Sequence, residues 1–251
     1  MIYLPETPLV FPEGLKPSCL PRTTLPGKCE WAPPLEDNID VIPQNQWDDY
    51  GYDVELHHHV KDIHKQTLGS CATEACSGSV ETKGQMQGLP FVSLNPHPIY
   101  YIASGGRDMG SNVDTVLRLC KERGFPPDVV WPRKEHNWRE KPPQSVWDDH
   151  ASHFRIDEVY DLTSIAEVGT ALLRGFLCPF GWRGHSCYLL RLLNDRQAEY
   201  VNSWGADWGT NGRGVINLSS INFGYGAYAV RSTRGWRAWW DKYAVQYGLA
   251  A

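Results

Sequence analysis

Cys71 lies in a stretch that could present a reactive thiol, Gln66-Thr-Leu-Gly-Ser-Cys-Ala-Thr-Glu-Ala-Cys76. Gly69 and Ser70 can form a tight turn, and the small residues that follow suit a closely packed helix. A thiol on the first turn of a helix lies beside unpaired N–H groups and the positive end of the macrodipole, which favour the thiolate. A thiolate nucleophile needs a base and a group that orients that base. A buried, unreactive thiol is the ordinary alternative.

Two later stretches could supply the base and its orienting group. Gly184-His185-Ser-Cys-Tyr-Leu-Leu begins an apolar strand with a histidine. In Tyr200-Val-Asn-Ser-Trp-Gly-Ala-Asp-Trp-Gly-Thr-Asn-Gly212, Asn202 ends a strand and Trp204 follows it. Cysteine, histidine and asparagine in this order match a thiol nucleophile, its base and the amide that holds the imidazole. The three motifs together predict a catalytic site, or one derived from a catalytic site.

These motifs resemble those of the papain-like cysteine peptidases. Asn202-Ser-Trp-Gly-x-x-Trp-Gly-x-x-Gly212 has every fixed residue of the family's Asn motif, and Gly184-His185 is similar to its His motif. Leu68-Gly-Ser-Cys-Ala72 agrees with the family's Cys motif at its three central positions. The stretch 108–113 is similar to the family's glycine-bearing lining of the cleft. The resemblance covers about residues 46–231.

The resemblance implies a role for each matching residue. Cys71 would attack the peptide carbonyl, and His185 would protonate the departing amine and later activate water. Asn202 would orient the imidazole, and Gln66 would donate to the oxyanion together with the Cys71 backbone N–H. The substrate-binding positions implied are Gly69, Ser70, Gly110 and Trp204, the last of which would also shield the His–Asn contact from water. The partner implied is a polypeptide substrate, with no cofactor.

Several positions depart from the family pattern. Positions 71 and 202 are 131 residues apart, within the roughly 130–150 that is usual, whereas His185 follows Cys71 by only 114. We therefore expect a loop of the second lobe to be trimmed on the primed side of the cleft. Ala72 stands where the family has Trp or Tyr, and Leu68 replaces a bridging cysteine. Gln66 is one residue closer to the nucleophile than usual.

Composition limits the remaining functional classes. The 251 residues carry a net charge of −5 with a pI near 6.0, which does not predict a nucleic-acid partner. No apolar run approaches the roughly 18 residues of a membrane span, and the first residues do not resemble a signal peptide. Seven scattered cysteines without a CxxC pair suggest mostly reduced thiols. We expect a cytoplasmic protein, or one assembled into a particle made in the cytoplasm.

The sequence pattern predicts an α+β protein of two lobes. Helices are expected over about 71–83, 112–123 and 164–174, the last with the capping-box pair Ser164 and Glu167. Short strands are expected over 176–178, 185–193, 199–202, 215–218 and 227–231. The resemblance makes this a papain-like fold, with a helical lobe over 46–150, an antiparallel β-barrel-like lobe over 151–231, and the cleft between them.

Both ends of the chain lie outside the resemblance. Residues 1–45 are rich in proline and predict an extended arm that lies against its own body or a neighbour. This arm lacks the helical pattern of an inhibitory prodomain. In the tail, residues 232–251, aromatic residues at 236, 239, 240, 243 and 247 mark one face of a helix. That face could pack on its own chain or dock a protein partner or assembly neighbour.

Two further interpretations remain open. His57, His58, His59 and His64 could suggest zinc, but their spacing fits no zinc site, so a solvated loop is expected and no metal. The arm, the aromatic tail and Ala72 suggest an alternative function, a structural or assembly component, for example of a virus particle, whose site is dormant or used once. A third hypothesis for the function is amidase or acyl-transfer chemistry, because the same order of triad residues serves those reactions.

Overall fold

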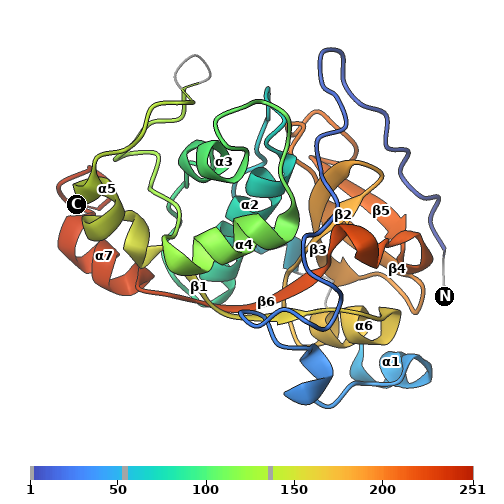
Figure 1. Ribbon diagram of the computed structural model, residues 1–251. Coiled ribbons are helices and arrows are strands. Elements are labelled where there is room, and N and C mark those ends of the chain that lie inside the picture. Colours follow the sequence, from blue (N-terminus) through green and yellow to red (C-terminus); the bar gives the residue numbers. More distant parts are fainter. Residues whose placement is uncertain (1–2, 53–55, 135–137, 251) are drawn as a thin grey trace.

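Helix α2 (Cys71–Met86) runs between a helical part and a β-rich part of the molecule (Figure 1). The structure is a computed structural model that describes residues 3–52, 56–134 and 138–250. Nearly every side chain of α2 is buried, including its polar ones. The α+β architecture predicted from the sequence is confirmed.

On the helical side, α3 (His97–Ala103) and α4 (Val113–Glu122) pack against α2. Helix α5 (Gln144–Asp149) lies farther out, away from α2 (Figure 1). Helix α4 begins where the sequence predicts, because the Asn112 side chain accepts a hydrogen bond from the Thr115 backbone N–H at 3.1 Å. Its apolar stripe, Val113, Val116, Leu117 and Cys120, is buried. Helices α3 and α5 are short and were not predicted.

The β-rich side is an antiparallel sheet in the order β2-β3-β4-β5. Its strands are β2 (Cys178–Trp182), β3 (His185–Leu192), β4 (Gln197–Val201) and β5 (Arg213–Asn217). Only Arg183 and Gly184 connect β2 to β3, both with positive φ of 51° and 79°, which is the pattern of a two-residue type I′ turn. The strand expected over 176–178 lies later, because residues 179–182 pair with β3 instead of forming a loop.

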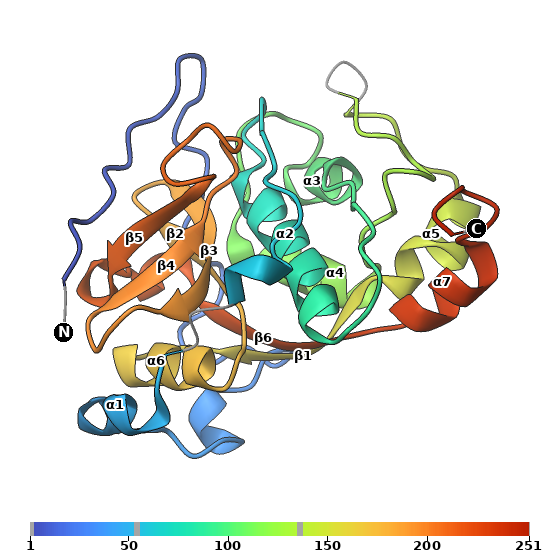
Figure 2. The ribbon, with the colours of Figure 1, turned by 180° about the vertical axis from the view of Figure 1, so that it is seen from behind.

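A second, two-stranded sheet passes beneath α2 and joins the two sides (Figure 2). It pairs β1 (Arg155–Asp161) with β6 (Tyr228–Arg234). Strand β1 was missed from the sequence, because Arg155-Ile-Asp-Glu-Val-Tyr-Asp161 carries charges at four of its seven positions. The bridges Leu177–Val230 and Phe180–Ala227 attach this sheet to β2.

Helix α6 (Ile165–Leu173) and the short α1 (Trp47–Tyr50) cover the outer side of the β-rich part (Figure 2). Helix α6 starts with the predicted capping box of Ser164 and Glu167, and Trp47 of α1 is completely buried against it. The remaining short 3-10 helices span Leu35–Asp37, Gln44–Gln46, Leu56–His59, Ala151–His153, Leu218–Ser220 and Phe223–Tyr225.

The N-terminal arm lies on its own chain along the β-rich side. Near its start, the backbone N–H of Thr7 donates to the Val215 carbonyl at 2.8 Å. Farther along, Arg22 forms a buried ion pair with Asp161 at 2.7 Å. Thr23 donates its backbone N–H and its hydroxyl to one carboxylate oxygen of Asp114, at 2.8 and 2.6 Å. These contacts tie the arm to both sides of the molecule.

The aromatic tail forms α7 (Trp236–Tyr243) and packs on its own chain. Trp236 and Trp239 are buried and both meet the ring of Phe154 edge-on. Tyr247 stacks on Trp239 with an interplanar angle of 8°. The aromatic face that could have served a partner is therefore largely covered by the chain itself. Among the described residues, none of the helices has the length and apolar character that a bilayer crossing requires.

We expect Trp239→Ala to lower the free energy of unfolding by about 3–5 kcal/mol, because it removes a completely buried ring from a packed cluster. Chemical denaturation followed by far-UV circular dichroism, which reports on the backbone and does not need a tryptophan signal, measures this change. Val245→Ala, at a side chain that is 72% exposed in the same tail, is the matched control and should change stability by less than about 0.5 kcal/mol. Similar effects of the two substitutions would contradict the docking of α7.

Candidate active site

His185 and Asn202 meet at the start of β3 and the end of β4. The Nε2 of His185 and the Oδ1 of Asn202 are 2.6 Å apart. The ring of Trp204 stacks on the imidazole, with 4.4 Å between ring centroids. Nε2 of His185 is hydrogen-bonded to Asn202. The other ring nitrogen, Nδ1, is buried and has no hydrogen-bond partner among the described residues. That nitrogen is the one available to act on a neighbouring group.

Cys71 is the first residue of α2, as the sequence predicted, and is completely buried. Its sulfur is 3.3 Å from the hydroxyl oxygen of Ser18. The backbone N–H groups of Ser186 and Ala72 also interact with the thiol. Since Ser186 directly follows His185, the thiol lies beside the beginning of β3. The start of α2 thus lies beside the residue that follows His185, but no hydrogen bond joins the Cys71 thiol to the His185 ring.

The N-terminal arm passes directly over this centre. The backbone N–H groups of Ser18 and Cys19 both donate to the carbonyl of Gly184, at 2.7 and 2.8 Å. On the other side, Ser111 donates to the Ser18 carbonyl at 3.1 Å and accepts from the Leu20 N–H at 3.0 Å, which is a parallel bridge. The arm is therefore hydrogen-bonded to both walls of the cleft at the level of Cys71.

Glycines let the arm approach this closely. A Cβ added at Gly110, whose φ is +87°, would lie 1.9 Å from the carbonyl oxygen of Ser18. A Cβ at Gly184 would lie 2.8 Å from the side chain of Pro17. Phe11, farther up the arm, contacts the rings of His185 and Trp204. The sequence predicted an extended arm but did not place Phe11 or Ser18 in the site, because a proline-rich segment carries no periodicity that reveals its path.

Burial sets the ionisation of both central groups. It raises the pKa of the Cys71 thiol to about 11, although hydrogen bonds from Ser18, Ser186 and Ala72 oppose the rise. It lowers the pKa of His185 to about 4, although Asn202 opposes the fall. At neutral pH both groups are therefore uncharged in this form. For Cys71 to form the thiolate that the sequence suggests, water or substrate would have to replace the arm.

Gln66 lies close to this centre but uses its side chain internally. Its Nε2 donates to the carbonyl of Leu68 at 2.9 Å, and its Oε1 accepts from the Ser203 hydroxyl at 2.5 Å. Its backbone N–H donates to the carbonyl of Ser203 at 2.8 Å. One of the two Nε2 hydrogens remains for an oxyanion. The segment that carries Gln66 is thus attached to the segment that follows Asn202.

The other predicted substrate-binding residues differ in their surroundings. The backbone N–H of Gly69 donates to Asp108 at 2.7 Å, and Ser70 precedes α2 with its hydroxyl donated to Glu74 at 2.9 Å. Gly110 and Trp204 contact the arm as described above. A groove of about 490 Å³ remains open beside the arm, lined by residues 14–18, 67–69 and 108–109.

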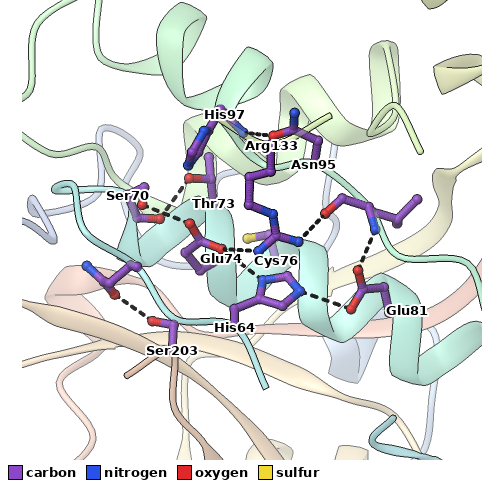
Figure 3. Close-up of polar contacts among 12 residues, drawn as sticks. His64, Ser70, Thr73, Glu74, Cys76, Glu81, Asn95, His97, Arg133 and Ser203 are labelled. Atoms are coloured by element: carbon purple, nitrogen blue, oxygen red, sulfur yellow. Dashed lines mark hydrogen bonds and ion pairs between the residues drawn. The ribbon is translucent and has the colours of Figure 1, made fainter. Parts of the chain in front are cut away.

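His64 lies in a buried cluster of charges beneath the site, not in the solvated loop expected from the sequence (Figure 3). Its two ring nitrogens are 2.8 and 3.0 Å from carboxylate oxygens of Glu74 and Glu81. Arg133 approaches Glu74 at 3.8 Å. The sequence held a signal for this cluster, because Glu74 and Glu81 are seven residues apart and share one face of a helix of small residues.

This cluster also contains the only group of possible metal ligands found among the described residues. Ligand-type atoms of Asp62, His64 and Glu81 lie within 4.8 Å of one another. However, both ring nitrogens of His64 already bind carboxylates. The positive charges of His64 and Arg133 lie against the negative charges of Glu74 and Glu81. The arrangement is an ion-pair network rather than a cation site.

Acid should loosen the arm. His185 has a pKa of about 4 under the arm, against 6.5 when solvated, so the covered form binds fewer protons between those pH values. Stability of the covered form is therefore present above pH 6.5 and is lost as the pH falls toward 4. Amide hydrogen exchange measures this change at Ser18, Cys19 and Leu20. After correction for intrinsic rates, we expect exchange at least about tenfold faster at pH 4.5 than at pH 6.5.

The control for this measurement is His185→Gln, which has no titrating ring. Its arm amides should show no such dependence on pH, with β4 amides serving as the internal reference in both proteins. An equal acceleration in the two proteins would show that another group is responsible.

Comparison with known proteins returned similar structures only, since no family model and no curated sequence matches the chain. Xylellain, a cysteine protease from Xylella fastidiosa, superposes with a TM-score of 0.59 at 17% identity, over 69% of this chain and 83% of that one. The Amb a 11 cysteine protease, a ragweed pollen allergen in its proform, gives a TM-score of 0.61 at 15% identity, over 85% and 71%. Digestive procathepsin L 3 of Tenebrio molitor gives 0.53 at 14%, over 69% and 67%.

Proposed function

The fold is that of papain-like cysteine proteases, in a divergent form, and we propose that this protein is a cysteine peptidase whose N-terminal arm keeps it latent. The observation that carries the proposal is the His185–Asn202 bond of 2.6 Å beside Cys71, with the second imidazole nitrogen unpartnered. An unsatisfied buried nitrogen costs about 1–3 kcal/mol. A base that must take a proton from the thiol needs such a free nitrogen, which supports the proposal.

The reaction would follow from the roles of these groups once the arm has moved. The Cys71 proton passes to Nδ1 of His185, and the thiolate attacks the substrate carbonyl. The oxyanion accepts hydrogen bonds from the Cys71 backbone N–H and from the remaining Nε2 hydrogen of Gln66. The imidazolium then protonates the leaving amine, and the imidazole activates the water that releases the acyl group. Asn202 and Trp204 hold the imidazole in place throughout.

The arm would control access to the site of such a peptidase. It occupies the cleft with backbone hydrogen bonds to Gly184 and Ser111, so a substrate cannot use those groups at the same time. Two of the similar structures are described as a proform or a proenzyme, which agrees with a covered form of the fold. Leu20 and Pro21 are exposed, so a cleavage sequence introduced between them would be accessible.

The proposal is tested by cutting the folded chain. A site-specific protease sequence inserted between Leu20 and Pro21 would release residues 1–20 while leaving the Arg22–Asp161 pair intact. We expect an epoxysuccinyl thiol inhibitor to label Cys71 at least tenfold faster after the cut, because the pKa shifts caused by burial are relieved. Peptide hydrolysis should appear in parallel and be absent in Cys71→Ala. Mass spectrometry locates the label, with the buried Cys76 of the same helix as internal control.

A second function is favoured by the same covered site. Cys71 and His185 are both buried under the arm, and both are uncharged at neutral pH, as expected of a structural or assembly component with a dormant site. If the cut chain loses residues 1–20 and Cys71 still reacts no faster than Cys76, the protein is a structural or assembly component with a dormant site and not a peptidase.

A further inference from the structure

The buried cluster beneath the site suggests a role for His64 that rests on the proposed function. We propose that His64 is a positioning residue, which holds the oxyanion donor Gln66 and the segment after Asn202 against helix α2. His64 does not touch the substrate cleft itself. It acts through the backbone and through the two glutamates of the helix that carries Cys71 (Figure 3).

The first step is the link from His64 to the helix. Glu74 and Glu81 are 3% and 2% exposed, and each holds one ring nitrogen of His64. Glu74 lies one turn after Cys71 and also accepts the hydroxyl of Ser70 at 2.9 Å. Glu81 lies two turns farther along and accepts the backbone N–H of Leu94 at 2.6 Å. A single imidazole thus fixes the segment around residue 64 at two points of α2.

The second step is the link from His64 to the site. The carbonyl of His64 accepts the backbone N–H of Gly205 at 2.9 Å. Lys65 forms an antiparallel bridge with Trp204, and Gln66 bonds to Ser203 through both its backbone and its side chain. Residues 64–66 therefore form a short ladder with residues 203–205, which directly follow Asn202. Any shift of His64 along α2 would move the oxyanion donor and the orienting segment together.

The charges around His64 favour its imidazolium form. It faces Glu74 and Glu81 from α2, Asp62 from its own segment, and Arg133, whose guanidinium is also paired with Asp128 at 3.0 Å. Burial alone would lower the pKa of His64, but the carboxylates outweigh it and raise the pKa to about 10. Burial likewise opposes ionisation of Glu74, yet His64 and Arg133 lower its pKa to about 2. Burial raises the pKa of Glu81 above its ordinary value, although His64 opposes the rise. His64 and Glu74 are consequently a charged pair at neutral pH.

A small cavity lies between the cluster and Asn202. It measures about 10 Å³ and is lined by Asp62, His64, Glu74 and Asn202 among others, which is about the space that one water molecule needs. The side-chain nitrogen of Asn202 is buried and without a partner among the described protein groups. A water there would accept from this nitrogen and donate to the acidic groups of the cluster, which would fix which way the Asn202 amide faces.

Hydrogen exchange in the uncut chain tests the positioning directly and does not depend on activity. We expect His64→Gln to accelerate exchange of the Gln66 and Gly205 amides at least tenfold, while amides of β4 and α4 keep their rates. His59→Gln, in the neighbouring 3-10 helix and outside the cluster, should change none of them. His64→Lys keeps the positive charge and should restore most of the protection. Uniform acceleration across the chain would overturn the proposal, because it would indicate only lost stability.

Kinetics of the cut chain provides the second readout. If His64 acts through Gln66, His64→Gln should lower kcat about tenfold or more with little change in KM, as expected for partial loss of an oxyanion donor. The same substitution should add little in a Gln66→Ala background. Full additivity would overturn the proposal. If the unsubstituted cut chain hydrolyses nothing, the proposed function fails, whereas the exchange measurement still decides the role of His64.

One outcome needs a further variant. Removing His64 leaves two buried carboxylates against a single guanidinium, and the protein could then fail to fold. In that case His64→Gln/Glu81→Gln, which removes one charge of each sign, takes its place with the same expected exchange pattern. Normal protection of Gln66 and Gly205 in this folded double variant would overturn the proposal.

Discussion

Helix α2 is surrounded on all sides, and this burial constrains the rest of the structure. A helix that lies between a sheet and other helices cannot expose its polar side chains to water, so each must find a partner inside. Glu74 and Glu81 are both paired with the imidazole of His64, and this pairing places the segment that carries His64 along the helix. The same burial puts Cys71 at the junction of the two sides of the molecule. The location of the thiol and the location of the charge cluster are two results of one packing arrangement.

The sequence predicted the parts of the site that depend on local chemistry. Asn202-Ser-Trp-Gly with its later glycines specifies a strand end and a sharp turn, and the structure has both. Ser164 with Glu167 specified the start of α6 in the same way. The helix at Cys71 was expected from small residues following a turn, and it extends to Met86, three residues beyond the expected end.

The parts that the sequence did not reveal depend on long-range contacts. Residues 14–20 of the N-terminal arm have no pattern of their own, and their path is set by the Gly184 carbonyl and Ser111 on distant segments. His64 was grouped with its histidine neighbours, although its environment is decided by residues 10 and 17 positions later. Strand β1 is stabilised by pairing with β6 rather than by its own propensity. In each case the deciding partner lies far along the chain.

The arm is a ligand that is covalently tethered to its own binding site. A short tether gives such a ligand an effective concentration in the millimolar range, so modest intrinsic affinity suffices for nearly complete occupancy. A single chain break after Leu20 turns this intramolecular equilibrium into a bimolecular one. At nanomolar or micromolar protein the released segment would then be diluted a thousandfold or more relative to its tethered concentration. Because occupancy depends on the ratio of this concentration to the dissociation constant, breaking one peptide bond would lower occupancy of the cleft without weakening any contact around Ser18.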